Sequence, residues 1–510
     1  MDDTLKMKLN QMLRYIEENI RVTDQTTIDF IDPRGHIERL SVKQNQIIFG
    51  RRGSGKSLLL KSIKEKSDIS VCLTINLEDF KDISFPDSII QVLKGILQQL
   101  KTKCVAQYSI WRFWEFGRIR EGRKCKKRID DFLNKLNSRL SVPDSYDTSI
   151  RTKQTGKAGG SVSAKTSAVS ASISAEDTEE IERNVSFNVD KLNSLRNELP
   201  ELKSVLNDCS IFLSQALFLI LDDFYFIRRN DQPFFIDYFH RLSKNIPLYL
   251  KVATIKHRSS LYLRQDTIYG VELGHDAQSL HLDYNLDNYD ALFSFMKDLL
   301  QTVERKTNVN IDFNSIFTDN AFKFLCFASG GVPRDFFSLL IRLGNKYTGR
   351  AISKPDVLEV AIENLPNKLD SFRTDSTEEN RLLEAYLQYI KNEVITEKRT
   401  NLFLVSNSDI ADYSQIRQAI KELVDLRLLH LVIPNTSSAP SDGKRYSAYM
   451  VDLSLLPNSK PQNFKLIEPD DRDSSGRADK IRSAIKLNLA QYKAYIEGLN
   501  IRQLLIETDE

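Results

Sequence analysis

The segment from Gly50 to Ser57 reads Gly-Arg-Arg-Gly-Ser-Gly-Lys-Ser and matches the complete phosphate-binding loop pattern. Glycines let the backbone wrap closely around a phosphate chain. The N–H groups of such a loop form an anion cradle together with the N-terminus of the following helix. The lysine of the pattern reaches the outer phosphates, and its last hydroxyl is a ligand for Mg²⁺. The sequence therefore predicts a site for ATP and Mg²⁺. The residues expected to hold them are Gly50, Gly53, Ser54, Gly55, Lys56 and Ser57, with Ser57 as a metal ligand.

The elements around this loop are those that the motif requires. Residues 46–49 read as a buried strand, and residues 58–63 read as the first turns of a helix. The alternative is a glycine turn that happens to end in Lys-Ser, but the strand–loop–helix context favours the phosphate loop.

An acidic strand end supplies the second half of a hydrolytic site. Residues 216–221 form a continuous apolar run that ends in Asp222 and Asp223. Such a run reads as a buried parallel strand, and its carboxyl end would place Asp222 beside the Mg²⁺ as a ligand. Asp223 stands where a water-activating glutamate often stands. Because its side chain is shorter, the sequence supports ATP binding more directly than hydrolysis. An exposed acidic strand end is the alternative.

Two further apolar runs, residues 70–77 and 248–254, complete an alternation of strands and helices. This alternation predicts an α/β fold with a parallel sheet and a ligand at the carboxyl ends of its strands. Thr254 is the polar end of its run and could hydrogen-bond the attacking water, although a plain strand-end threonine fits equally well. Either Arg258 or Arg264 could be an arginine finger that reaches a neighbouring subunit. The alternative for each is a solvated surface arginine.

A third motif lies further along the chain, where Gly330 to Asp335 read Gly-Gly-Val-Pro-Arg-Asp and open an amphipathic helix. This turn resembles the sensor 2 segment of AAA+ ATPases, above all that of the origin-recognition and replication-initiator clade. The order of motifs fits, because phosphate loop, Walker B strand, sensor 1 strand and lid follow one another. The resemblance covers residues 30–455 and implies that Arg334 leans from a helical lid onto the γ-phosphate. Asp223 in place of glutamate, the lack of a sensor 1 asparagine and a long insertion depart from the family pattern.

The composition is that of a soluble globular protein, with 41% hydrophobic and 28% charged residues among 510. This length predicts roughly two to four domains. No apolar run reaches about 18 residues, so no membrane span is expected, and the acidic first residues do not read as a signal peptide. The five scattered cysteines form no C-x-x-C pair, which fits a reducing cytoplasm and argues against structural zinc and disulfides. The net charge of +3 does not by itself imply a nucleic-acid partner.

An insertion at about residues 85–210 stands where a simple α/β core needs a single helix. Trp111 and Trp114 precede a run, residues 118–128, in which seven of eleven residues are basic. Cations beside aromatics suit phosphate contacts and base stacking, and a solvated helix face over a buried aromatic patch is the alternative. The Ser/Ala-rich residues 156–176 read either as a small-residue β-ribbon or as a flexible linker. The candidate DNA contacts are Arg123, Lys124, Lys126 and Lys127.

After a helical lid at residues 311–373, residues 374–456 predict a helix, a strand, two helices and a hairpin. This is the order of a winged helix, and the resembled clade carries such a domain after its lid. Its second helix and hairpin turn offer groove and phosphate contacts, but acidic neighbours dilute the charge, and winged helices also dock proteins. Residues 457–476 read as a linker and 477–505 as one helix with an apolar stripe. The candidate DNA contacts are Arg417, Lys421, Lys444 and Arg445.

The sequence thus predicts a P-loop ATPase core at residues 1–310, a helical lid, a winged helix and a tail at 457–510. We expect a cytoplasmic MgATP-binding AAA+-like ATPase in which ATP controls assembly with itself or a partner protein and the grip on DNA, without a membrane partner. The expected catalytic residues are Asp223, Thr254 and Arg334. One alternative is a non-hydrolysing nucleotide switch that serves as a protein-interaction scaffold. The other, an ATPase subunit of a bacterial anti-phage defence or mobile-element system, rests on resemblance alone.

Overall fold

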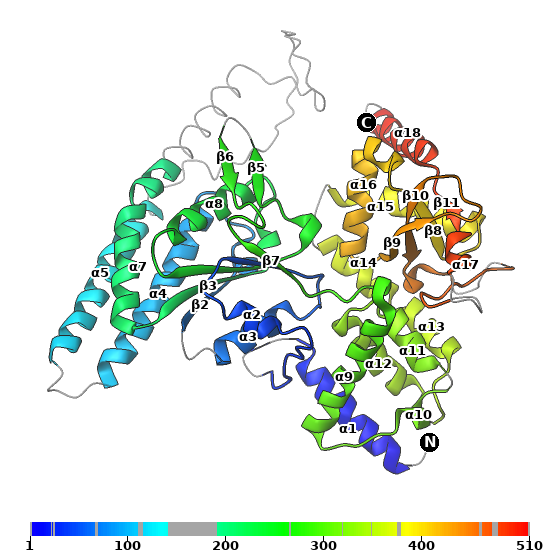
Figure 1. Ribbon diagram of the computed structural model, residues 1–510, viewed down its shortest axis with the longest axis horizontal. Helices are drawn as coiled ribbons and strands as arrows, with labels where there is room; N and C mark the ends of the chain where they lie inside the picture. The colour runs from blue at the N-terminus through cyan, green and yellow to red at the C-terminus, as the bar shows by residue number, and fades with distance from the viewer. Residues whose placement is uncertain are drawn as a thin grey trace, which may run out of the picture.

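The computed structural model describes residues 3–21, 23, 26–66, 70–110, 116–140, 191–264, 267–318, 320–347, 349–374, 379–457, 462–471 and 478–507. At its centre is a five-stranded sheet with the strand order β2-β3-β4-β1-β7, in which every neighbouring pair is parallel. The strands are β1 (Gln46–Phe49), β2 (Ser70–Asn76), β3 (Ala216–Asp222), β4 (Leu248–Thr254) and β7 (Gln278–His281). Their apolar runs are long because helices cover both faces. The predicted α/β class with a parallel sheet is confirmed (Figure 1).

Each face of this sheet contributes to a separate apolar cluster. Because successive strand residues point to opposite faces, Ile47 and Phe49 join one cluster and Ile48 joins the other. The Ile48 face is covered by α2 (His36–Leu40) and α3 (Lys56–Lys66), and the opposite face by helices that include α8 (Gln232–Ser243).

Short elements follow the strands at their carboxyl ends, where a ligand of a parallel sheet binds. The elements are η1 (Leu77–Phe80) after β2, η2 (Phe224–Phe226) after β3, η3 (Lys256–Arg258) after β4, the antiparallel hairpin β5 (Tyr262–Arg264) and β6 (Ile268–Gly270), and η4 (Leu286–Asn288) after β7.

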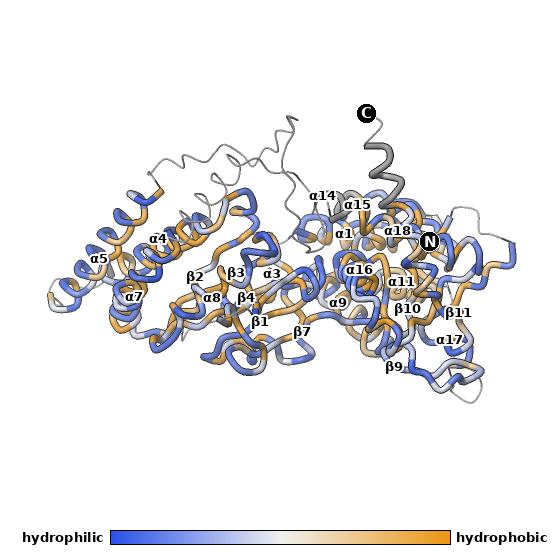
Figure 2. Tube along the Cα trace, turned by 90° about the horizontal axis from the view of Figure 1, so that it is seen from above, coloured by the Kyte–Doolittle hydropathy of each residue, from blue (hydrophilic) through white to orange (hydrophobic). Residues whose placement is uncertain are grey.

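The insertion between β2 and β3 forms a projecting arm of three packed helices, α4 (Asp87–Ile110), α5 (Phe116–Leu140) and α7 (Leu199–Leu213). Buried residues of α5 such as Ile129 and Phe132 join the sheet's apolar cluster. In both views the arm lies at one end of the molecule and the C-terminal module at the other (Figure 1 and Figure 2). Both tryptophans and the Ser/Ala-rich residues 156–176 lie outside the described residues.

The residues expected to form the lid are helical, and the N-terminal helix packs with them. Although the expected division assigned α1 and α9 to the nucleotide core, α1 contacts both α9 and α12, and its Leu13 shares the apolar cluster of the lid. The helices are α1 (Asp3–Asn19), α9 (Tyr289–Thr307), α10 (Phe313–Ile316), α11 (Ala321–Ala328), α12 (Pro333–Lys346), α13 (Lys354–Glu363) and α14 (Leu365–Thr374).

The C-terminal module contains the elements expected from the sequence, in the expected order. A four-stranded sheet, β11-β8-β10-β9, carries helices on its sides, and its apolar residues are continuous with those of the lid. The elements are α15 (Glu379–Ile390), the π-helix η5 (Lys391–Glu397), β8 (Leu402–Ser406), η6 (Asp409–Asp412), α16 (Ser414–Asp425), β9 (Leu429–Ser437), β10 (Arg445–Val451) and η7 (Leu453–Leu455). The assignment of this module as a winged helix stays a prediction.

The C-terminal tail differs from the single helix predicted at residues 477–505. It forms α17 (Asp479–Arg482), β11 (Ile485–Lys486) and α18 (Leu489–Glu507). Ile485 pairs in parallel with Phe403 of β8, because β8 is otherwise an open edge whose backbone groups need partners. Part of the expected linker packs against the C-terminal module, since Asn401 of the module exchanges two hydrogen bonds with the backbone of Ile467.

None of the described helices combines the length and the apolar character needed to cross a membrane.

Candidate nucleotide-binding site

One cavity brings together residues that the sequence connected only by motif. Lys56 of the phosphate loop, Asp223 beyond β3 and Arg334 at the start of α12 all line it. Its lining also includes Gly53, Ser54, Gly55 and Ser57. Gly50 does not line the cavity, and its backbone carbonyl accepts a hydrogen bond from the Lys56 Nζ.

The backbone of the loop requires glycine at Gly53. Its φ of +85° lies in the left-handed region that side chains disfavour. A Cβ there would also lie 2.7 Å from the Cβ of Arg334. The two segments touch, because the Arg334 N–H donates to the Gly53 carbonyl at 3.4 Å.

We expect Gly53→Ala to weaken MgATP binding by about 5- to 150-fold, which corresponds to about 1–3 kcal/mol of backbone strain. The added methyl group would push Arg334 away from the loop. Equilibrium titration with a fluorescent ATP analogue measures the change. Gly117→Ala is the matched control, because a Cβ at Gly117 meets no atom within 4 Å. Equal affinity of the two variants would contradict this account of the loop.

Lys56 is buried in the loop, with 6% of its surface exposed. Its Nζ donates to the carbonyls of Gly50 at 2.9 Å and Arg51 at 3.2 Å. Burial lowers the pKa of Lys56, while the charges of Asp223 and Asp222 oppose that shift. The Ser54 hydroxyl is buried in the same loop and has no hydrogen-bond partner among the described residues. The loop thus holds a cation and a spare hydroxyl in position for an anionic ligand.

Two adjacent carboxylates stand opposite the loop. Asp222 ends β3, and one of its oxygens accepts the N–H of Asp223 at 2.9 Å. Asp223 turns the chain with φ of +52°. Burial, together with the charge of Asp222, raises the pKa of Asp223 to about 6.

These donors fit a magnesium ion. Ser57 lies in the first turn of α3 and Asp222 ends β3 of the same sheet, and both offer the oxygen ligands that Mg²⁺ prefers. The crowded charges of Asp222 and Asp223 would be relieved by a divalent cation. Among the described residues no three His, Cys, Asp or Glu side chains are grouped to hold a metal alone. Mg²⁺ in nucleotide sites takes only one or two protein ligands, beside phosphate oxygens and water.

Arg334 lies at the start of α12, next to the phosphate loop. Arg334 lines the cavity beside the phosphate loop, and burial, with the charges of Arg427 and Arg52, lowers its pKa. Its role toward a γ-phosphate stays a prediction.

Thr254, Arg258 and Arg264 do not line this cavity. Thr254 is fully buried at the end of β4, and its hydroxyl shares a hydrogen bond with Ser259. Arg258 lies over the ring of Tyr225, which does line the cavity, with 5.4 Å between guanidinium carbon and ring centroid. Arg264 is exposed on the β5–β6 hairpin. Its surface position is compatible with either reading of the sequence, solvated arginine or arginine finger.

Sequence reasoning missed the apolar end of the cavity. The segment before the first strand contributes Ile28 and Phe30 to the lining, and helices α9 and α12 contribute Phe295, Leu299 and Phe337. An apolar wall beside a charged loop suits the flat base and the phosphates of one nucleotide. The signal in the sequence is a short apolar stretch before residue 46, but only the fold shows which wall it builds. A second missed residue, Glu78, also lines the cavity.

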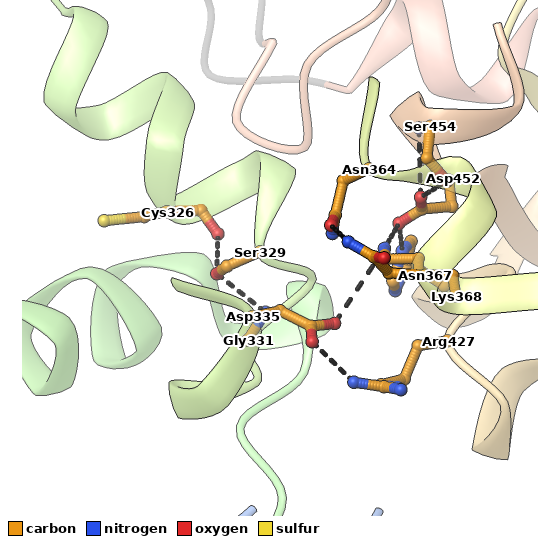
Figure 3. A network of polar contacts seen from close by, with 11 residues as sticks. Cys326, Ser329, Gly331, Asp335, Asn364, Asn367, Lys368, Arg427, Asp452 and Ser454 are labelled. Atoms are coloured by element: carbon orange, nitrogen blue, oxygen red, sulfur yellow. Dashed lines mark hydrogen bonds and ion pairs between the residues drawn. The ribbon is translucent and has the colours of Figure 1, made fainter. Parts of the chain in front are cut away.

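A buried ionic network joins the residue after Arg334 to the C-terminal module (Figure 3). Asp335 accepts from Arg427 at 2.5 Å, and Lys368 pairs with Asp452 at 2.7 Å and with Asp335 at 3.9 Å. His430 bonds the same Asp452 at 2.7 Å. Although burial opposes ionisation, the charge of Lys368 and the bond from His430 hold the pKa of Asp452 well below its usual range. The lid and the C-terminal module are therefore held together by charge as well as by apolar packing.

Helix α16, which carries the candidate DNA contacts Arg417 and Lys421, is docked on η3 beside the central sheet. Gln418 donates to the carbonyl of His257 at 3.1 Å, and Asp425 accepts the N–H of the same residue at 2.9 Å. Glu422 pairs with Arg229 at 3.1 Å. Of the predicted DNA contacts, Arg417 and Arg445 are exposed and Lys421 is half-buried. Lys444 is exposed and pairs with Asp409 at 2.6 Å.

The basic run of the arm lies on the solvent face of α5. Arg123, Lys124 and Lys127 are exposed and Lys126 is half-buried, on a helix whose opposite side is buried. Flanking cations are engaged, since Arg128 pairs with Asp208 and Lys101, Lys135 and Arg139 also have acidic partners. No hydrogen bond or ion pair links Arg123, Lys124, Lys126 or Lys127 to another described residue.

Comparison with protein families and with curated sequences found no match. Three solved structures align along most of the chain at low similarity. A Walker-type ATPase of Pyrococcus abyssi is 14% identical over 87% of this chain and 93% of its own, with a TM-score of 0.34. The Aeropyrum pernix Orc1 protein in complex with DNA is 12% identical over 85% and 93%, with a TM-score of 0.35. Drosophila ORC bound to DNA is 13% identical over 86% and 94%, with a TM-score of 0.28. Similarity of this degree carries no functional conclusion for this chain.

Proposed function

We propose that this chain is an AAA+-like ATPase that binds MgATP between its sheet and its lid and uses the nucleotide to control contacts of its C-terminal module. The observation that supports this most is the meeting of Lys56, Asp223 and Arg334 at one cavity, from three separate parts of the fold. A phosphate loop, an acidic strand end and a lid cation are the parts that phosphoryl transfer requires.

The roles follow from position. Backbone N–H groups of the loop and the N-terminus of α3 cradle the phosphates, and Lys56 exchanges its two carbonyl partners for phosphate oxygens. Ser57 and Asp222 would hold Mg²⁺, which neutralises phosphate charge when bound. Arg334 adds positive charge from the lid. Closure of the lid would therefore bring this charge into contact with the phosphates. Asp223 is the carboxylate placed to orient the attacking water.

ATP turnover by the purified chain, with and without duplex DNA, tests this function. We expect MgATP binding and turnover that duplex DNA stimulates. Tight binding without turnover under any condition would support the non-hydrolysing switch instead. Failure to bind MgATP would remove the proposal altogether.

The switch with a scaffold role is the second candidate, and the docked α16 favours it. Residues next to the candidate DNA contacts Arg417 and Lys421 already contact the core, since Gln418 bonds the backbone of His257 and Glu422 pairs with Arg229. A surface engaged in this way suits a module whose protein contacts change with the nucleotide.

The outer face of α5 is proposed as a DNA backbone contact. Four of its cations, Arg123, Lys124, Lys126 and Lys127, span just over one helical turn and lack acidic partners among the described residues. Changing Arg123, Lys124, Lys126 and Lys127 to glutamine is expected to weaken duplex binding uniformly across sequences. The salt dependence should also fall, by about one unit of slope for each cation that contacts a phosphate.

Fluorescence anisotropy at several salt concentrations measures both effects. Neutralising Lys43, Lys64, Lys480 and Lys493, which are exposed outside the arm, is the control for net charge. Equal losses in the two sets would assign the effect to overall charge rather than to the arm.

A further inference from the structure

Glu78 is a carboxylate of the cavity that no motif accounts for. It lies in η1, directly after β2, and lines the cavity together with Lys56, Asp223 and Arg334. The strand pairing explains this placement. β2 and β3 run parallel with Asn76 opposite Asp222, so the segments that follow the two strands lie side by side.

Local contacts fix the backbone of Glu78 where the residue lines the cavity. The side chain of Asn76 caps η1 by accepting the N–H of Glu78 at 3.1 Å. Leu77 is fully buried beside it and anchors the turn. Glu78 itself is exposed, and no hydrogen bond or ion pair joins its carboxylate to another described residue.

Asp223 is less well placed to activate the attacking water alone. Its chain turns in the left-handed region, its own N–H is bound back to Asp222, and its side chain is one methylene shorter than a glutamate. Attack on a phosphate held by the loop must come in line from the side opposite the leaving oxygen. Three carboxylates line the cavity together with Lys56. Asp29 is paired with Lys306 at 2.8 Å, which leaves Asp223 and Glu78.

We propose that Glu78 accepts the proton of the attacking water during ATP hydrolysis, while Asp223 orients the same water. This rests on the proposed function. The water oxygen bonds to the γ-phosphorus, and the bond from that phosphorus to the bridging oxygen breaks with its electron pair passing to ADP. The water proton passes to the Glu78 carboxylate and then to solvent as phosphate leaves. A general base of this kind contributes about 10²- to 10⁴-fold to the rate.

The test compares Glu78→Gln with Asp79→Asn, a neighbouring acid of η1 that is exposed outside the cavity. For Glu78→Gln we expect kcat to fall by at least about 100-fold, an MgATP dissociation constant within about threefold of wild type, and accumulation of protein holding uncleaved ATP. Asp79→Asn should keep wild-type values. Glu78→Asp should retain more turnover than Glu78→Gln, because it keeps a carboxylate.

The outcomes separate this inference from the function on which it rests. Wild-type turnover by Glu78→Gln overturns the role of Glu78 and leaves the ATPase standing. A parallel loss of kcat and of MgATP affinity would assign Glu78 to nucleotide binding and also overturn the base role. If the wild-type chain binds MgATP but never cleaves it, the base role falls while the nucleotide site stands. If it binds no MgATP, both proposals fall.

Discussion

Replacing Lys56 with alanine is expected to remove turnover and to raise the dissociation constant for MgATP by about 10- to 150-fold, the worth of one charge-assisted hydrogen bond of about 1.5–3 kcal/mol. The side chain is buried, and its Nζ already sits between two loop carbonyls, so the fold holds it where a phosphate would lie. Turnover should suffer more than binding, because charge on the transferring phosphate is stabilised most in the transition state.

Isothermal titration with MgATP and a phosphate-release assay measure the two effects. Lys64→Ala is the matched control, since Lys64 is an exposed lysine of the same helix α3. Turnover of Lys56→Ala equal to that of the control would mean that any ATPase activity arises elsewhere than in the phosphate loop.

The second large effect is expected from Arg427→Met. This change leaves buried Asp335 with one ion pair among the described residues, to Lys368 at 3.9 Å. Breaking one side of a buried ion pair costs about 3–5 kcal/mol. The unfolding midpoint of the lid and C-terminal module should therefore fall by about 10 °C. Circular dichroism during heating measures it.

Two further variants show whether the cause is the unpaired charge. Adding Asp335→Leu to Arg427→Met should recover most of the loss, because no uncompensated carboxylate then remains at that position. Glu359→Ala, which breaks an exposed ion pair with Lys346, should leave the midpoint almost unchanged. Equal effects of Arg427→Met and Glu359→Ala would contradict a special role for the buried network.

The sequence revealed the parts of the site that sit at element ends with a fixed spacing. The phosphate loop, Asp222 and Arg334 each follow from a local pattern, because a strand end or a helix start fixes where such a side chain emerges. Glu78 could not be found in this way, since its placement depends on β2 and β3 being neighbours in register. Phe30 depends likewise on where the N-terminal segment crosses the loop.

The sequence also could not predict elements whose packing partners are remote in the chain. The apolar spacing of residues 477–505 fits a helix, but the open edge of β8 draws Ile485 into a strand pair. The docking of α16 on η3 joins residues such as Glu422 and Arg229 that are remote in sequence. Periodicity reports which face of an element is apolar, and it is silent on what covers that face.

The packing of α1 against α9 and α12 has a mechanical consequence. The first helix belongs to the lid side, so the chain passes between lid and sheet twice, once before β1 and once after β7. These two connecting segments define a hinge axis between the lid and the sheet. They allow bending about that axis and resist twisting across it. The residues around Phe30 lie in the first crossing and also line the cavity. A nucleotide that contacts these residues would act directly on the hinge. The N-terminal helix and the C-terminal module would then move together with the lid.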